Sequence, residues 1–149
     1  MAWNRPVVGT QVSAVMESVV EEPPSNAEVF EFDGTGLAAG RRLVFRCAAN
    51  AGLSTPRAND FVLAVNEILT NSVLHGGGSG VLRIWPEDDR LVCEVEDRGR
   101  IDDPLAGRRR PDPDQPNGRG LWMANQLCDL VQLRSTGGGN FVRLHMLQR

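Results

Sequence analysis

Hydrophobic and polar residues recur with two different periods along the chain, and the changes of period divide it into strands and helices. Alternation with a period of two predicts strands at residues 28–34, 81–85, 91–97, 130–135 and 140–147. Helical spacing with matching start and stop signals predicts helices at residues 36–52, 55–76 and 118–128. This order of elements predicts an α+β fold, a two-layer sandwich in which helices pack on one face of a mostly antiparallel sheet and leave the other face wetter.

The second of these helices has the clearest ends. Thr55 is expected to be its N-cap, with Pro56 at the first helical position and Gly76 at its end. Residues 1–27 carry no clear period and are predicted to be a loosely ordered extension, so that residues 28–149 form the single domain. Residues 98–117, rich in Arg, Pro and Asp, are predicted to be a long loop.

Composition narrows the functional classes. The formal net charge of -3 gives no basic surface, so we expect no direct nucleic-acid partner. Three widely spaced cysteines favour a reducing compartment, and no apolar run is long enough for a membrane span; a cytoplasmic protein is therefore expected. All 16 basic residues are arginines, which excludes mechanisms that need a lysine.

The helix at 55–76 carries polar residues on one of its faces. Val62, Val65, Leu69 and Val73 are spaced as an apolar stripe, and a second face holds Asp60, Ala64, Glu67, Asn71 and His75. Glu67 and Asn71 are four residues apart and therefore point the same way. A solvated face is the more common explanation of a glutamate on a helix, whereas asparagine is a poor residue for a helix interior.

Two further segments carry candidate chemistry. Alternation in the strand at 91–97 puts Asp97 on the apolar face, where a carboxylate needs hydrogen-bond donors, unless the strand ends at Val95 and Asp97 turns outward. Gly118 and Gly120 precede the last helix, where backbone N–H groups suit a phosphate. A lone Gly-x-Gly is more often a turn or a cap.

The three segments in this order resemble the Bergerat-fold ATPases, a superfamily that includes gyrase, histidine kinases, mismatch-repair ATPases and a heat-shock chaperone. The matching segments are "NEILTNSVLHG", "DRG", "GRGL" and "TGGG", and the resemblance covers residues 28–147. The small size and short lid are most similar to the anti-sigma-factor serine/threonine kinases. The resemblance implies the histidine-kinase-like ATPase fold, and ATP with Mg²⁺ as cofactors.

The resemblance also implies roles for individual residues. Glu67 would be the general base and Asn71 the Mg²⁺ ligand, while Asp97 would accept a hydrogen bond from the adenine amino group. The nucleotide would further contact a set of residues in and around the glycine segments: Gly99, Gly118, Arg119, Gly120, Leu121 and Asn140. Arg108, Arg109, Arg110 and Arg119 offer charge to the phosphates, although a solvated loop is the more common explanation of any one of them.

The implied activity is that of an anti-sigma factor that is also a protein serine/threonine kinase. Its partners would be a sigma factor and a phospho-acceptor antagonist of the STAS type, and relatives often form homodimers. The alternative is a non-catalytic nucleotide-binding module that controls a partner by binding alone; a detached histidine-kinase catalytic domain is a third reading. The chain departs from the family pattern at Ile101, at Pro116 and Asn117, and at Asn140, where relatives often carry threonine.

Overall fold

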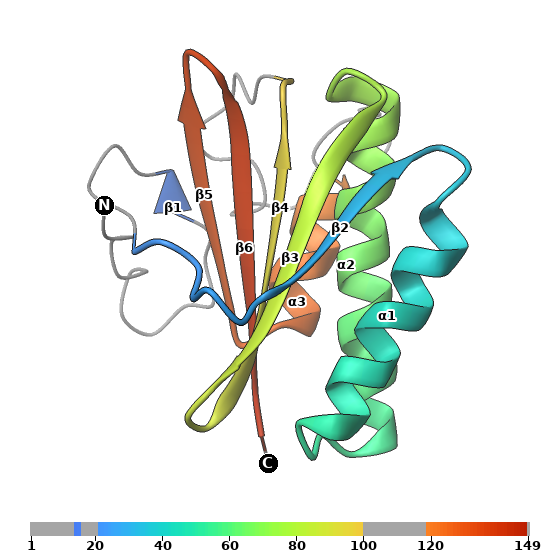
Figure 1. The fold of residues 1–149 in the computed structure, drawn as a ribbon, viewed down its shortest axis with the longest axis vertical. Coiled ribbons are helices and arrows are strands. Elements are labelled where there is room, and N and C mark those ends of the chain that lie inside the picture. The colour runs from blue at the N-terminus through green and yellow to red at the C-terminus, as the bar shows by residue number, and fades with distance from the viewer. Residues whose placement is uncertain (1–13, 16–20, 100–118, 149) are drawn as a thin grey trace.

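The computed structural model describes residues 14–15, 21–99 and 119–148, and these contain three helices and six strands (Figure 1). In chain order the elements are β1 (Ala14–Val15), β2 (Glu28–Asp33), α1 (Leu37–Asn50), α2 (Thr55–His75), β3 (Ser79–Glu87), β4 (Arg90–Asp97), α3 (Arg119–Leu127), β5 (Leu130–Thr136) and β6 (Gly139–Leu147). Among the described residues, no helix combines the length and the apolar character that a bilayer crossing requires.

One sheet forms the first layer, with the strand order β1-β5-β6-β4-β3-β2. Every neighbouring pair is antiparallel except β1 and β5, which run parallel. The helices form the second layer, on one face of the sheet (Figure 1). This confirms the predicted α+β sandwich with a mostly antiparallel sheet.

The core lies between the two layers. On β4, Leu91, Cys93 and Val95 face the helices, each at most 1% exposed, as the alternation in the sequence predicts. From α2 the same core receives Phe61, Val65, Ile68 and Leu69. The apolar stripe of α2 is therefore wider than predicted, since it adds Phe61 and Ile68, and it also buries Ala64, which was assigned to the polar face.

The start of α2 differs from the prediction by one residue. Ser54, not Thr55, is the N-cap: its backbone is extended (φ −60°, ψ 157°), and its side-chain oxygen accepts the Arg57 N–H at 3.4 Å. Pro56 consequently falls one position further into the first turn. A serine hydroxyl caps a helix at least as well as a threonine, so the sequence alone did not separate the two neighbours.

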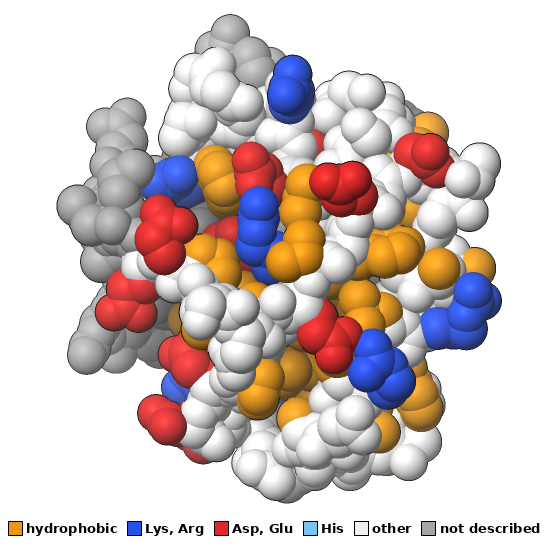
Figure 2. Space-filling view, viewed as in Figure 1, with side chains coloured by type: hydrophobic (Ala, Val, Ile, Leu, Met, Phe, Trp, Pro, Cys, Tyr) orange, Lys and Arg blue, Asp and Glu red, His pale blue; other side chains and the backbone are white. Residues whose placement is uncertain are grey.

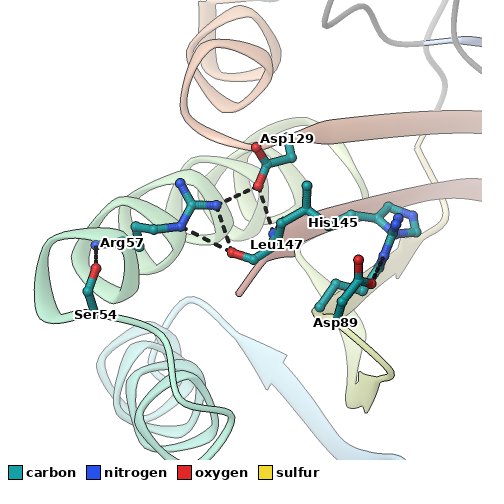
Figure 3. Close-up of polar contacts among 7 residues, drawn as sticks. Ser54, Arg57, Asp89, Asp129, His145 and Leu147 are labelled. Carbon is teal, nitrogen blue, oxygen red and sulfur yellow. Dashed lines mark hydrogen bonds and ion pairs between the residues drawn. The ribbon is translucent and has the colours of Figure 1, made fainter. Parts of the chain in front are cut away.

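A set of hydrogen bonds, which we call the Arg57 clasp, joins the start of α2 to the end of β6 (Figure 3). Arg57 Nη2 donates to Asp129 Oδ2 at 2.5 Å and to the Leu147 carbonyl at 2.8 Å. Asp129 Oδ2 also accepts the Leu147 N–H at 2.7 Å. The clasp joins α2, the turn after α3 and the end of β6.

The other face of the sheet was expected to be wet, but it holds buried charge. Glu94 is 2% exposed, and its Oε1 accepts from Arg143 Nη2 at 2.7 Å and from Nε at 3.2 Å. Arg143 in turn lies over the Trp85 ring, 5.2 Å from its centroid, and donates to the Glu21 carbonyl at 2.9 Å. On the face turned to the viewer in Figure 2, acidic and basic side chains are interspersed with apolar ones.

His145 lies in the same layer. Its Nε2 is 2.9 Å from Gln132 Oε1, and its Nδ1 is 3.5 Å from Arg90 Nη1. Burial, with the charges of Arg90 and Arg143, lowers the pKa of His145 from 6.5 to about 3. The ring is therefore neutral near pH 7, donating through Nε2–H to Gln132 and accepting through Nδ1 from Arg90.

The N-terminal 27 residues lie mostly outside the described part of the chain. Two of them, Ala14 and Val15, form β1, with Ala14 opposite Gln132 and Val15 opposite Leu133 of β5. The segment that leads into β2 contains a turn in which the Ala27 N–H donates to the Pro24 carbonyl.

Candidate functional site

The end of β4 meets the end of α2, and Asp97 lies at this junction. Asp97 is the last residue of β4 and is paired in register with Asn140 of β6. Its half-buried side chain points toward the helix layer, as the alternation predicts, and reaches Ser72 of α2. The sheet thus places a carboxylate beside the last turns of the helix that carries Glu67 and Asn71.

Asp97 accepts three hydrogen bonds from three different parts of the chain. Oδ2 accepts from Ser72 Oγ at 2.5 Å, and Oδ1 accepts from the Gly99 N–H at 2.9 Å and from Asn140 Nδ2 at 3.1 Å. Behind Asn140, Ser135 Oγ of β5 lies 2.7 Å from Asn140 Oδ1. These three donors satisfy the oxygens of a carboxylate that faces the core, as its half-buried position requires.

Two glycines allow the backbone to approach this carboxylate closely. A Cβ atom on Gly76, the C-cap of α2, would collide with the carboxylate of Asp97. A Cβ atom on Gly99 would lie 2.6 Å from Gly76 Cα and 2.8 Å from the His75 carbonyl oxygen. The end of α2, the end of β4 and the residues after it are therefore packed backbone to backbone.

Asn71 and Gly120 form a second point of contact. A Cβ atom on Gly120, in the first turn of α3, would lie only 2.8 Å from Asn71 Nδ2 and 3.4 Å from Asn71 Oδ1. The polar face of α2 is thus open to the backbone at the start of α3 because residue 120 has no side chain. Glu67, one turn before Asn71, is half-buried, and its carboxylate has no hydrogen-bond partner in the described part of the chain.

The remaining candidates divide into three groups. Leu121 packs into the core at 6% exposure, so its side chain is a structural contact of α3. His75 is exposed in the last turn of α2. The third group lies outside the described residues: Ile101, Arg108, Arg109, Arg110, Pro116, Asn117 and Gly118, together with the side chain of Arg119.

Three residues of the site were not among the predicted site residues: Ser72, Ser135, and Gly76, whose backbone packs against the carboxylate of Asp97. Ser72 had a usable signal. It follows Asn71 directly, and the step of one residue moves it onto the buried face, where a polar side chain needs a partner; it is 1% exposed. Ser135 had no such signal, because only the β5–β6 register brings it opposite Asn140.

Cysteine chemistry does not contribute to this site. Burial raises the pKa of both Cys93 and Cys128 above the usual thiol range, so both remain protonated and unreactive. No group of three or more His, Cys, Asp or Glu side chains within the described ranges could hold a metal ion. The chemistry available is instead an oriented carboxylate, a carboxylate without a hydrogen-bond partner among the described residues, and an amide packed against the backbone of Gly120, an arrangement suited to a polar ligand with hydrogen-bond donors and phosphate groups.

Comparisons with known proteins bear on the family and the fold of this chain. Residues 30–146 match the family model of the histidine kinase-like ATPase domain, whereas curated protein sequences give no significant match. One similar solved structure is that of the RsbU and RsbW domains of Rv1364c from Mycobacterium tuberculosis, with a TM-score of 0.62 and 21% identity over 85% of this chain. Another is the Acinetobacter baumannii histidine kinase AdeS, with a TM-score of 0.50 and 11% identity over 82% of this chain.

Both solved structures are of longer chains: the match covers 34% of the first and 68% of the second. At these identities the likeness shows the shared fold, whereas the family model matches most of the chain directly. The chain belongs to the histidine kinase-like ATPase domain family.

Proposed function

We propose that this protein is an ATP- and Mg²⁺-dependent serine/threonine kinase that acts as an anti-sigma factor. It phosphorylates a STAS-type antagonist of the anti-sigma factor and sequesters a sigma factor when the antagonist is phosphorylated. The family supports ATP binding. The observation that carries the kinase assignment is the pair on α2: Glu67 without a hydrogen-bond partner among the described residues, and Asn71 one turn further along, next to Gly120.

The residues fit a bound nucleotide. Asp97 is held by three donors and faces the junction of β4 and α2, where it can accept from the amino group of adenine. Because Gly120 has no side chain, the first turn of α3 lies directly against Asn71, and a helix N-terminus favours phosphate oxygens. The base and the phosphates would thus be bound by different elements of one junction.

The residues also fit Mg²⁺. This ion keeps several waters and takes one or two protein ligands besides the phosphate oxygens, so it does not need the cluster of carboxylates that the described residues lack. Asn71 would supply a side-chain oxygen. When bound, Mg²⁺ neutralises charge on the β- and γ-phosphates.

Glu67 is the group proposed to handle the proton. As the hydroxyl oxygen of the acceptor serine or threonine bonds to the γ-phosphorus, the bond from that phosphorus to the β,γ-bridging oxygen breaks and ADP leaves. The hydroxyl proton passes to a carboxylate oxygen of Glu67. A carboxylate with no hydrogen bond in the described part of the chain has its lone pairs available for this transfer.

A groove between α1 and α2 supports the partner-binding part of the proposal. It is lined by Ala38, Arg41, Arg42, Phe45, Arg46 and Val62. Phe45 is an exposed aromatic side chain, 41% accessible, and three arginines line the groove with it. An acidic segment with an apolar anchor is the partner chemistry that this groove fits.

The test is Glu67→Gln, which keeps the size of the side chain and removes its basicity. We expect Mg-ATP affinity to stay within about twofold of the parent, while transfer of label from γ-labelled ATP to a STAS-type antagonist falls by at least about 100-fold. Glu31→Gln, the same change at an exposed position of β2, is the matched control and should transfer at the parental rate.

The outcomes separate the candidate functions. A Glu67→Gln variant that transfers label as fast as the parent contradicts the assigned base. A parent that binds Mg-ATP and the antagonist but transfers no label is instead the non-catalytic binding module.

A further inference from the structure

Two leucines of α2 are exposed on the side of the helix that faces away from the core. Leu63 is 44% exposed and Leu74 is 66% exposed. Leu63 is two residues, or about 200° around the helix, from the buried Phe61 and Val65, so its side chain points to the opposite side. The two leucines are eleven residues apart, three turns plus about 20°, and therefore leave α2 in nearly the same direction, about 16 Å apart along its axis. We call this pair the leucine stripe.

Glu67 lies between the two members of the leucine stripe. It follows Leu63 by one turn, about 6 Å along the helix axis, and precedes Leu74 by two turns, about 10 Å. Glu67 is half-buried, so the two exposed leucines stand on either side of it. A protein whose hydroxyl group reaches the carboxylate of Glu67 therefore has to cover the surface that the leucine stripe forms.

Positive charge borders the leucine stripe on the side of α1. This helix carries Arg41, Arg42 and Arg46 and no acidic residue, in a protein whose formal net charge is -3. Arg41 Nη1 donates to Asn66 Oδ1 at 2.9 Å, so its guanidinium lies against α2 at the residue before the proposed base. Arg46 pairs with Glu28 at 2.8 Å, whereas in the described part of the chain Arg41 and Arg42 have no carboxylate partner. Two uncompensated positive charges on this side of the molecule favour an acidic partner.

The leucine stripe continues the groove between α1 and α2. Val62, which lines that groove, directly precedes Leu63, and Phe45 is exposed in the same groove. Four large apolar side chains are exposed within the described ranges, and three of them, Phe45, Leu63 and Leu74, belong to α1 and α2. The fourth, Val29, lies on β2. Exposed apolar side chains that gather beside one another mark an interaction surface, whereas a single one does not.

We propose that the leucine stripe, together with Arg41 and Arg42, is the docking platform for the phospho-acceptor protein. The acceptor presents two apolar side chains to the leucines and acidic side chains to the arginines, and this brings its hydroxyl group to Glu67. Leu63 and Leu74 are positioning residues and take no part in the chemical step. This inference rests on the proposed kinase function and adds to it the surface that selects the protein substrate.

The experiment is the transfer of label from γ-labelled ATP to a STAS-type antagonist, measured on the full chain as a function of antagonist concentration. Leu63→Gln and Leu74→Gln should each raise the KM for the antagonist about five- to tenfold, the effect of losing an apolar side chain that binding buries. The kcat and the affinity for Mg-ATP should stay within about twofold of the parent. Val29→Gln, the same new side chain at an exposed apolar position of β2, is the matched control and should leave KM unchanged.

Arg42→Gln tests the charge of the docking platform. The KM for the antagonist should rise about threefold at low salt, and it should increase less steeply with NaCl concentration than the KM of the parent, because one of the screened charges is gone. All of these positions are exposed, so thermal denaturation should give the parental midpoint for each variant.

Three results would overturn the inference: a parental KM in both leucine variants, a KM that Val29→Gln raises equally, or an Arg42→Gln variant whose KM matches the parent at every salt concentration. If the parent binds the antagonist but transfers no label, the kinase function is wrong, and the dissociation constants of the same variants decide whether the docking platform exists. A parent that neither binds nor phosphorylates the antagonist overturns the function and the inference together.

Discussion

Replacing Asp97 by asparagine should change the ligand preference of the site more than its folding. An amide has one acceptor oxygen, and the N–H groups of Gly99 and Asn140 both require an acceptor at the Oδ1 position. The new oxygen therefore occupies that position, and the new NH₂ takes the place of Oδ2. There it donates to Ser72 Oγ, since a hydroxyl accepts as readily as it donates.

The cost to stability is consequently small, because the two N–H donors at the Oδ1 position keep their acceptor and Ser72 stays hydrogen-bonded to residue 97; we expect about 1 kcal/mol or less. The cost to ATP binding is larger. The position that accepted from the adenine amino group becomes an N–H, and donor then faces donor. Loss of a hydrogen bond to a charged group is worth about 1.5–3 kcal/mol, or a roughly 10- to 150-fold weaker affinity for ATP.

The same reversal should favour inosine triphosphate, whose six-position carries a carbonyl oxygen that accepts. We expect the affinity for ITP relative to ATP to rise by at least about tenfold in Asp97→Asn. Isothermal titration with Mg-ATP and Mg-ITP measures both values, and Asp89→Asn, the same change at an exposed position, is the control. An Asp97→Asn variant that binds ATP like the parent, with an unchanged ITP preference, would refute the assignment of residue 97 to the base.

Three further predictions concern the packing and charge of the fold. Gly76→Ala should abolish measurable Mg-ATP binding in the same titration, because the added Cβ atom would collide with the carboxylate of Asp97 and displace it. Unchanged affinity would contradict this packing. Asp129→Ala should lower the free energy of unfolding, measured in urea, by about 2–4 kcal/mol, since Arg57 loses a largely buried partner. The control Asp89→Ala removes an exposed ion pair and should cost less than about 1 kcal/mol; equal costs for the two variants would argue against the clasp. The pKa of His145 is lowered to about 3 in the folded protein, so between about pH 6.5 and pH 3 the unfolded chain binds a proton that the folded protein does not. The free energy of unfolding should therefore fall by up to about 1.4 kcal/mol per pH unit as the pH is lowered through this range. His145→Gln should remove this part of the pH dependence.

Much of the fold was predictable because the sheet has one strongly apolar face. Leu91, Cys93 and Val95 alternate with polar residues, and that alternation fixes both the strand and the direction of Asp97 at its end. The end of α2 was equally readable from Gly76, and its start was misplaced by one residue because two hydroxyl residues are adjacent there.

The site was predictable only where one element carries the signal. Glu67 and Asn71 share a helix face, so spacing alone groups them. Ser135 and Asn140 lie on two strands, and their contact depends on the β5–β6 register, which a single sequence does not give. The polar layer on the outer face was missed for the same reason: Glu94 and Arg143 read as solvated residues until β4 and β6 are paired.

The Arg57 clasp places an unusual constraint on the end of β6. Leu147 takes part through its main-chain N–H and carbonyl, so many side chains at this position would preserve both bonds. A chain shortened to residue 146 would instead lose the bonds of both groups at once, and Asp129 would be the one clasp partner that Arg57 keeps. Substitution at residue 147 should therefore be tolerated across descendants of this protein, while deletion of that residue should be selected against.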